Sequence, residues 1–164
     1  MKYLSILTLG LVAALTSCNG DPTIEERLEG DWLLNDIVAT GNIVYQGQTV
    51  SITANDSIID ASSIFTLVEN PNSITAVIDA TLKVGSATSS VAMPYANTAV
   101  GTWSVKHGNG VAMDSLIITE NNGTVTRYEI INLLESSVKL RGLMDVDVQG
   151  TSNPLNFELN FQKQ

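Results

Sequence analysis

The stretch VKLRGLMDVDV, residues 138–148, decides the fold class of this chain. Apolar and polar residues alternate along it almost without interruption. One face would carry Val138, Leu140, Gly142, Met144, Val146 and Val148, and the other Lys139, Arg141, Asp145 and Asp147. A repeat of two residues kept over this length is typical of a β-strand that buries one face. The sequence therefore predicts a strand over 138–148.

The same alternation is found in two other segments. In LNFELNFQ, residues 155–162, leucine and phenylalanine alternate with polar residues, and residues 74–84 alternate in the same way. Weaker strands are expected at 31–39, 43–53, 63–69, 100–107, 112–120 and 124–134. The pattern therefore predicts about nine strands in one domain.

Short segments rich in glycine, asparagine and proline separate the expected strands. They are TGN at 40–42, ENPNS at 69–73, HGNG at 107–110, ENNG at 120–123 and QGTSNP at 149–154. Turns this short join antiparallel neighbours. The longest stretch without a clear pattern, residues 85–99, is low in charge and rich in small residues. We expect a loop there.

These strands and turns predict an all-β, antiparallel meander. Closing into a barrel covers all sheet edges, so we expect a barrel of about eight to nine strands. A two-sheet sandwich is the main alternative. A short helix is expected ahead of the first strand, with Thr23 as N-cap, Glu26 three residues on and Gly30 as terminator.

The N-terminal residues have the features of a secretory signal peptide. Lys2 supplies a positive charge, residues 4–15 are almost wholly apolar, and small residues follow. The apolar run is shorter than the roughly 20 residues that a membrane-spanning helix needs. The exit from it, Leu15-Thr16-Ser17-Cys18, resembles the lipobox of bacterial lipoproteins.

The lipobox resemblance implies that residues 1–17 are removed and that Cys18 is lipidated. In that family the thiol takes a diacylglyceryl group and the new amine is acylated, and several chains such as palmitate anchor a protein stably. Asn19 is not the aspartate that retains such proteins at the inner membrane, which favours the outer membrane. The expected divisions are a signal peptide at 1–17, a lipidated N-terminus and linker at 18–24, and a domain at 25–164. A secreted protein with an unmodified cysteine is the alternative.

Two short segments, LEGDWLLND at 28–36 and GTWSV at 101–105, resemble elements of the lipocalin-like lipoproteins of Gram-negative bacteria. Gly30 and Trp32 match the G-x-W element with which lipocalins begin. The resemblance implies a lipocalin-like β-barrel in which the tryptophan fills the closed end. It also implies a late arginine packed across that tryptophan, for which Arg127 and Arg141 are the candidates through cation–π stacking.

Composition and single residues argue against several classes of function. The formal net charge of −9 argues against nucleic-acid binding. A single cysteine cannot form a disulfide within the chain. His107, the one histidine, has no H-x-H or H-E-x-x-H pattern around it, and no serine has a supporting catalytic motif. We therefore expect a non-enzyme without catalytic residues, metal or cofactor, and a solvated turn histidine.

Two triplets, Asp56-Ser57-Ile58 and Asp114-Ser115-Leu116, match the D-S/T-aliphatic pattern of O-glycosylation in exported proteins of some of the same bacteria. Ser57 and Ser115 are therefore candidate O-glycosylation sites. The alternative is that both are ordinary turn residues.

Two functions remain open from the sequence. The first is a lipid-anchored binding protein whose barrel takes a small apolar ligand or lipid, which requires an open apolar cavity at one barrel end. The second is a non-catalytic structural or partner-binding surface lipoprotein with a filled barrel core, which requires an exposed patch or an unpaired strand edge. Both place the protein in the cell envelope.

Overall fold

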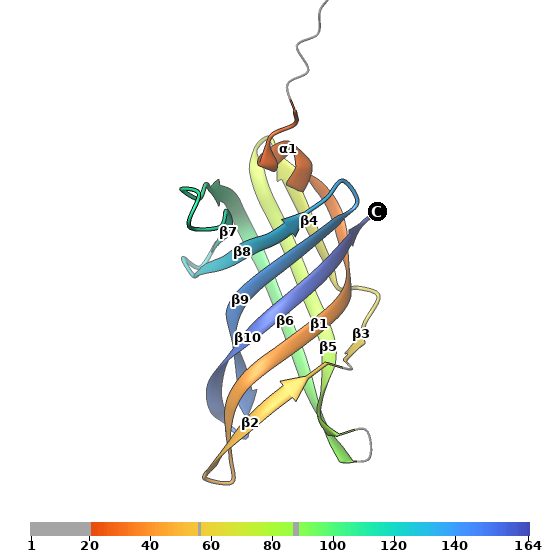
Figure 1. The fold of residues 1–164 in the computed structure, drawn as a ribbon, viewed down its shortest axis with the longest axis vertical. Coiled ribbons are helices and arrows are strands. Elements are labelled where there is room, and N and C mark those ends of the chain that lie inside the picture. The colour runs from red at the N-terminus through yellow and green to blue at the C-terminus, as the bar shows by residue number, and fades with distance from the viewer. Residues whose placement is uncertain (1–20, 56, 87–88) are drawn as a thin grey trace, which may run out of the picture.

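The fold, given by a computed structural model, is described for residues 21–55, 57–86 and 89–164. Helix α1 (Ile24–Leu28) is followed by strands throughout the described chain (Figure 1). The strands are β1 (Gly30–Tyr45), β2 (Gln48–Ala54), β3 (Ile58–Ile59), β4 (Ile64–Glu69), β5 (Asn72–Ser86), β6 (Ser89–Lys106), β7 (Ser115–Glu120), β8 (Val125–Leu133), β9 (Ser137–Val148) and β10 (Thr151–Lys163). The expectation of an all-β chain with a short N-terminal helix is confirmed.

The strands form one antiparallel sheet that closes on itself. From β5 to β10 each strand pairs with the next along the chain. The last strand, β10, then pairs with β1, in a register that runs from Trp32 opposite Lys163 to Gly41 opposite Leu155. Because β4 pairs with both β1 and β5, eight strands make a ring in the order β1, β10, β9, β8, β7, β6, β5, β4. Figure 1 shows this ring as an elongated, strongly twisted body.

The two ends of the ring differ. At one end, called the helix end below, α1 lies across the opening beside the start of β1 and the end of β10 (Figure 1). At the other, called the hairpin end, lie the β1–β2 and β9–β10 turns and the paired ends of β5 and β6. Here β2 follows β1 through a two-residue turn at Gln46 and Gly47, but it pairs with β5 only through Ala54 and Val84. The ring is therefore tightly paired at the helix end and loosely paired at the hairpin end.

The expected turn at residues 40–42 is wrong, because β1 continues through it to Tyr45. Gly41 lies opposite Leu155 in the pairing with β10, and a Cβ atom at Gly41 would stand 2.8 Å from Cδ2 of Leu155. The glycine therefore serves a close approach between two strands rather than a reversal of the chain.

The expected loop at residues 85–99 is also wrong, because this segment completes β5 and makes most of β6. Its residues pair with β5 in one continuous register, in which Met93 lies opposite Leu82 and Tyr95 opposite Ala80. The small side chains of this segment give only a weak local preference for a strand. Pairing with β5, whose apolar and polar residues alternate clearly, keeps the segment extended.

The core fills the inside of the ring. Aromatic rings from different strands meet there: Phe65 and Phe161 lie 4.6 Å apart between ring centroids, and Tyr95 and Phe157 lie 5.1 Å apart. A cavity of about 10 Å³ lies beside Phe65 and Tyr128, which is about the room of one water molecule. The middle of the ring is therefore packed by side chains.

Candidate functional site

The helix end of the ring is closed around Trp32. Its side chain is buried, and the indole N–H donates to the carbonyl of Leu28 at 2.7 Å, at the end of α1. The guanidinium of Arg27 donates to the carbonyl of Leu133, which joins α1 to the end of β8. The helix is thereby fixed over the opening, and Leu28 is buried beneath it. The sequence pattern placed Gly30 and Trp32 at the start of β1, where they are found.

The cation over Trp32 is a lysine rather than an arginine. Nζ of Lys163, at the end of β10, lies 5.1 Å from the centroid of the Trp32 ring. The candidates Arg127 and Arg141 are engaged elsewhere: Arg127 donates to Oγ of Ser115, and Arg141 pairs with Glu129 at 2.9 Å. The expectation of an arginine over the tryptophan is therefore wrong, because the β1–β10 register brings Lys163 opposite Trp32.

The hairpin end contains an apolar cavity of about 410 Å³. It lies between the β1–β2 hairpin, the facing ends of β5 and β6, and the end of β9. The apolar lining residues with the most buried side chains are Ile43, Ile52, Met93 and Val148. Tyr45, Val50 and Val91 also line it and are exposed, Val91 to 61%.

This cavity, called the end cavity below, has the composition of a site for an apolar ligand. Apart from the phenol of Tyr45, none of its lining residues is ionisable, and its polar side chains are the hydroxyls of Ser51 and Thr53. Apolar side chains left exposed in a concave site lower their free energy when an apolar molecule covers them. The sequence did not single out Met93 and Val91, although the alternation of Val91, Met93 and Tyr95 was a signal that could have identified them.

A second cavity, of about 800 Å³, opens on the side of the ring and is called the side cleft below. It lies between β6 and β9, below the turn that joins β7 to β8. Charged residues line it, including Arg127, Glu129 and Arg141, and exposed apolar side chains are present at Val125 and Leu143. The side cleft therefore differs in chemistry from the end cavity.

Two buried phenols lie between the side cleft and the core. The hydroxyl of Tyr95 donates to Sδ of Met144 at 3.2 Å, and that of Tyr128 donates to the same sulfur at 3.4 Å. Burial raises the pKa of Tyr95 to about 12. Burial, and then the proximity of Tyr95, raises the pKa of Tyr128 further. Both phenols are therefore neutral at physiological pH.

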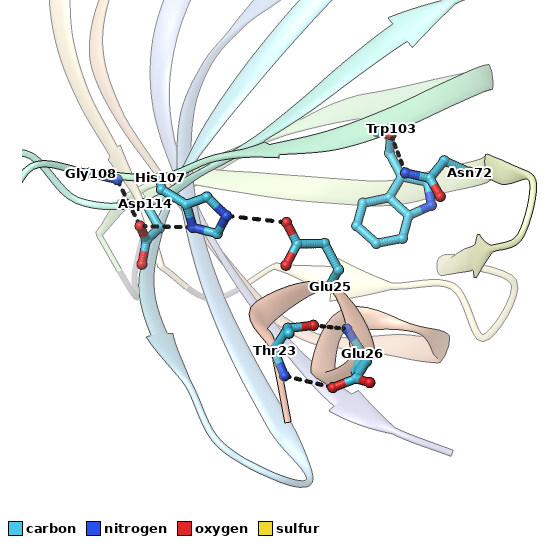
Figure 2. A network of polar contacts seen from close by, with 8 residues as sticks. All are labelled: Thr23, Glu25, Glu26, Asn72, Trp103, His107, Gly108 and Asp114. Carbon is cyan, nitrogen blue, oxygen red and sulfur yellow. Dashed lines mark hydrogen bonds and ion pairs between the residues drawn. The ribbon is translucent and has the colours of Figure 1, made fainter. Parts of the chain in front are cut away.

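His107 lies just beyond the end of β6, between two carboxylates (Figure 2). Its Nε2 is 3.3 Å from Oε1 of Glu25 on α1, and its Nδ1 is 3.8 Å from Oδ1 of Asp114. Its side chain is 62% exposed. The two carboxylates face opposite nitrogens of the ring, so a single ion bound to one nitrogen would not reach both. Within the described part of the chain, no group of three or more His, Cys, Asp and Glu side chains is arranged to hold a metal ion.

Figure 2 also shows how α1 begins. The side chain of Thr23 accepts from the amide of Glu26 at 3.2 Å, and the carboxylate of Glu26 accepts from the amide of Thr23 at 2.7 Å. This is the reciprocal cap that the spacing of the two residues predicts. The helix start expected from the sequence is confirmed.

The two candidate O-glycosylation sites are covered in the folded chain. Ser115 is fully buried at the start of β7, and its Oγ accepts from both Nε and Nη2 of Arg127. Oγ of Ser57 is also out of contact with solvent and has no hydrogen-bond partner among the described residues. A glycan on Ser115 would have to displace Arg127 or be added before the strand forms.

The proposed lipidation site Cys18, the signal peptide at 1–17 and the first part of the linker lie outside the described residues. Between residues 21 and 164, leaving out 56, 87 and 88, no helix has both the length and the hydropathy to cross a membrane. No known family model matches this chain, and no curated protein sequence matches it.

Proposed function

We propose that this chain is an envelope-anchored, lipocalin-like lipoprotein that binds a small apolar ligand or lipid. The observation that carries the proposal is the end cavity of about 410 Å³, with its apolar and uncharged lining. Its position matches the open end that a carrier of apolar molecules needs.

The lipocalin-like barrel is the finer part of the fold proposal. A ring of eight strands, a short helix ahead of the first strand and a buried Trp32 at the helix end support it. The G-x-W element at Gly30 and Trp32 supports it from the sequence. A departure from the lipocalin pattern is that Lys163, rather than an arginine of the described chain, supplies the cation over Trp32.

The end cavity favours uncharged or weakly polar ligands. A charge moved from water into this lining would find no ion-pair partner among the residues around it. The ligand would therefore place a hydrocarbon portion against Ile52 and Met93, with any polar group near Ser51, Thr53 or the solvent.

The lipid anchor rests on the lipobox at Leu15-Thr16-Ser17-Cys18 and on the apolar run before it. It would hold the domain at the bacterial envelope, with Asn19 favouring the outer membrane. Mass spectrometry of the mature chain is expected to find an N-terminal acylated Cys18. An unmodified thiol at that residue, or a different cleavage site, would contradict the anchor.

The fluorescent probe N-phenyl-1-naphthylamine tests the ligand site. We expect its fluorescence to rise on binding to the wild-type domain. Val91→Glu places a charge in the end cavity and is expected to weaken binding about tenfold or more. Val100→Glu is the matched control, because Val100 lies on the opposite face of the same strand and is 48% exposed.

Two outcomes would contradict the proposal of ligand binding. One is a wild-type domain that leaves the fluorescence of the probe unchanged. The other is equal binding by the Val91→Glu and Val100→Glu variants. Either result would favour the alternative of a filled core and a partner-binding role, for which the packed middle of the ring gives the structural basis.

A further inference from the structure

Two strands of the ring have long stretches without a partner on one side. The pairing between β8 and β9 ends where Tyr128 meets Gly142, so residues 143–148 pair with β10 alone among the described strands. Across the side cleft, residues 89–100 of β6 pair with β5 alone, because β7 begins its pairing with β6 at Gly101. The ring therefore has a gap between residues 89–100 of β6 and residues 143–148 of β9.

The hydrogen-bonding groups of β9 point into this gap. The turn at Gln149 and Gly150 has two residues, both with positive φ, so Val148 and Thr151 form the hydrogen-bonded pair that closes the hairpin. Since backbone groups alternate in direction along a strand, those of Leu143, Asp145 and Asp147 turn away from β10. The residue opposite Asp145 is Pro154, which has no amide hydrogen.

Leu143 and Asp145 line the side cleft, and on this side no described strand pairs with residues 143–148 of β9. The six residues that lack a partner on this side, at about 3.3 Å each, give an edge about 20 Å long, which is the length of an ordinary strand. Buried side chains lie beneath the cleft, where Tyr95 and Met144 are in contact at 3.2 Å. Leu143 at its rim is 62% exposed. The cleft thus combines a free strand edge with an apolar floor.

The facing edge of β6 is less suited to pairing. The carbonyl of Val100 accepts from the amide of Asn121, so the backbone groups of Thr98, Ala96 and Pro94 alternate toward the cleft. Pro94 has no amide hydrogen to donate and is typical of an edge strand that stays unpaired. The edge of β9 is therefore the one that can bind another strand.

From this geometry we infer that the side cleft binds an extended peptide segment in which basic and apolar residues alternate, added as a strand to the edge of β9. Such a segment would turn its apolar side chains toward Tyr95 and Met144. Its basic side chains would lie on the outer face beside Asp145 and Asp147, which are exposed. In the same cleft Arg141 is already paired with Glu129, and Arg127 is held by Ser115.

A second copy of this chain is a poorer occupant. Edge-to-edge pairing of two copies would place Asp145 and Asp147 of one chain near the same residues of the other. Each chain also carries a net charge of −9. Like charges placed opposite each other on adjacent strands are destabilising.

Three synthetic peptides of about eight residues test this inference. The first alternates lysine and valine, the second alternates glutamate and valine, and the third is the lysine peptide with alternate amides N-methylated. By fluorescence anisotropy, we expect the lysine peptide to bind and the glutamate peptide to bind about tenfold more weakly or not at all. The N-methylated peptide keeps the charge and loses the donors, so it should also bind about tenfold more weakly.

Two substitutions at one position separate charge from backbone pairing in the protein. Asp145→Asn removes the charge and is expected to weaken binding of the lysine peptide about threefold. Asp145→Pro also removes the free amide and is expected to weaken it about tenfold. Val50→Glu, in the end cavity on β2, should leave peptide binding unchanged, so this inference and the proposed ligand site fail or succeed separately.

Equal binding of the methylated and unmethylated lysine peptides would overturn strand addition and leave only attraction between charges. A stable dimer of the wild-type chain in sedimentation equilibrium, abolished by Asp145→Pro, would assign the edge to a second copy and overturn the peptide as occupant. The peptide comparison stands even if the Asp145→Pro variant does not fold, because it uses the unaltered protein.

Discussion

At the scale of single residues, Trp32 is the largest side chain that is fully buried among the described residues. Its ring is buried at the helix end, its N–H holds the end of α1 through the carbonyl of Leu28, and Lys163 covers its face. One side chain thus joins the helix, the first strand and the last strand. Trp103 makes a comparable bond from its indole N–H, but the acceptor is the carbonyl of Val68 in β4 rather than a carbonyl of α1.

We predict that Trp32→Phe lowers the free energy of unfolding by about 1–3 kcal/mol, because the ring is shortened and the carbonyl of Leu28 loses its donor. Urea denaturation measures the loss. Hydrogen exchange at the amides of Arg27 and Glu29, which bond to the carbonyls of Thr23 and Glu25 within α1, should become faster.

Trp103→Phe is the matched control for that experiment. It should lower the free energy of unfolding by a similar amount, while leaving the rate of hydrogen exchange at the α1 amides unchanged. Equal acceleration of α1 exchange in both variants would show that α1 loosens with overall stability, and that Trp32 does not hold it specifically.

The residue scale also shows what sequence can and cannot predict. The place of Gly30 and Trp32 at the start of the first strand was predicted because the two residues lie in one short segment. The cap formed by Thr23 and Glu26 was predicted because these residues are three positions apart. Lys163 was missed because it reaches Trp32 through a pairing between the two ends of the chain. Spacing along the sequence carries no information on which distant cation will lie over a ring.

At the scale of elements, the strands were predicted most accurately in the segments where apolar and polar residues alternate most clearly. The strands expected at 74–84, 138–148 and 155–162 all lie within observed strands. In these segments one face is buried and the other exposed. The apolar or polar character of each residue therefore indicates which face of the sheet it lies on.

The weaker elements were misplaced where partner strands override local preference. Glycine and asparagine at 40–42 are typical of a turn, but pairing with β10 on one side and β2 on the other keeps these residues extended. The actual turn uses Gln46 and Gly47, where both φ values are positive. The same dipeptide recurs at Gln149 and Gly150, and there the turn was expected.

The candidate sites were harder to predict than the fold. The end cavity depends on how far β2 stays from β5, and the side cleft depends on β7 and β8 being short relative to β6 and β9. Both are consequences of strand lengths and register. Neither appears as a motif in the sequence, although Leu143, an exposed apolar residue at a polar position of the alternating β9, marks a place where the pattern is broken.

At the scale of the whole molecule, the two buried phenols make stability depend on alkaline pH. Burial holds the pKa of Tyr95 at about 12 in the folded state, against an ordinary value of about 10. A raised pKa in the folded state contributes stability that is fully present below pH 10 and is lost as pH rises toward 12. Tyr128, whose pKa is raised further, acts in the same direction.

We therefore predict that the free energy of unfolding falls between about pH 10 and 12, by up to roughly 1.4 kcal/mol per pH unit for each phenol. Urea denaturation at several pH values measures the slope. Tyr95→Phe keeps the ring beside Phe157 and removes one titrating group, so the slope should be about halved. A slope that Tyr95→Phe leaves unchanged would assign the alkaline loss to other groups.

Closure of the ring through β1 and β10 has a consequence for how the chain is made. The first strand leaves the ribosome long before the last, and at about 5–20 residues per second the interval between them is roughly 5–20 s. Until β10 emerges, one side of β1 has no partner, so the nascent chain presents an edge of unpaired backbone N–H and C=O groups to its surroundings. The pairing of β1 with β10 can therefore form only after synthesis of the chain is complete. A chaperone that binds unfolded chains would be most useful during this interval.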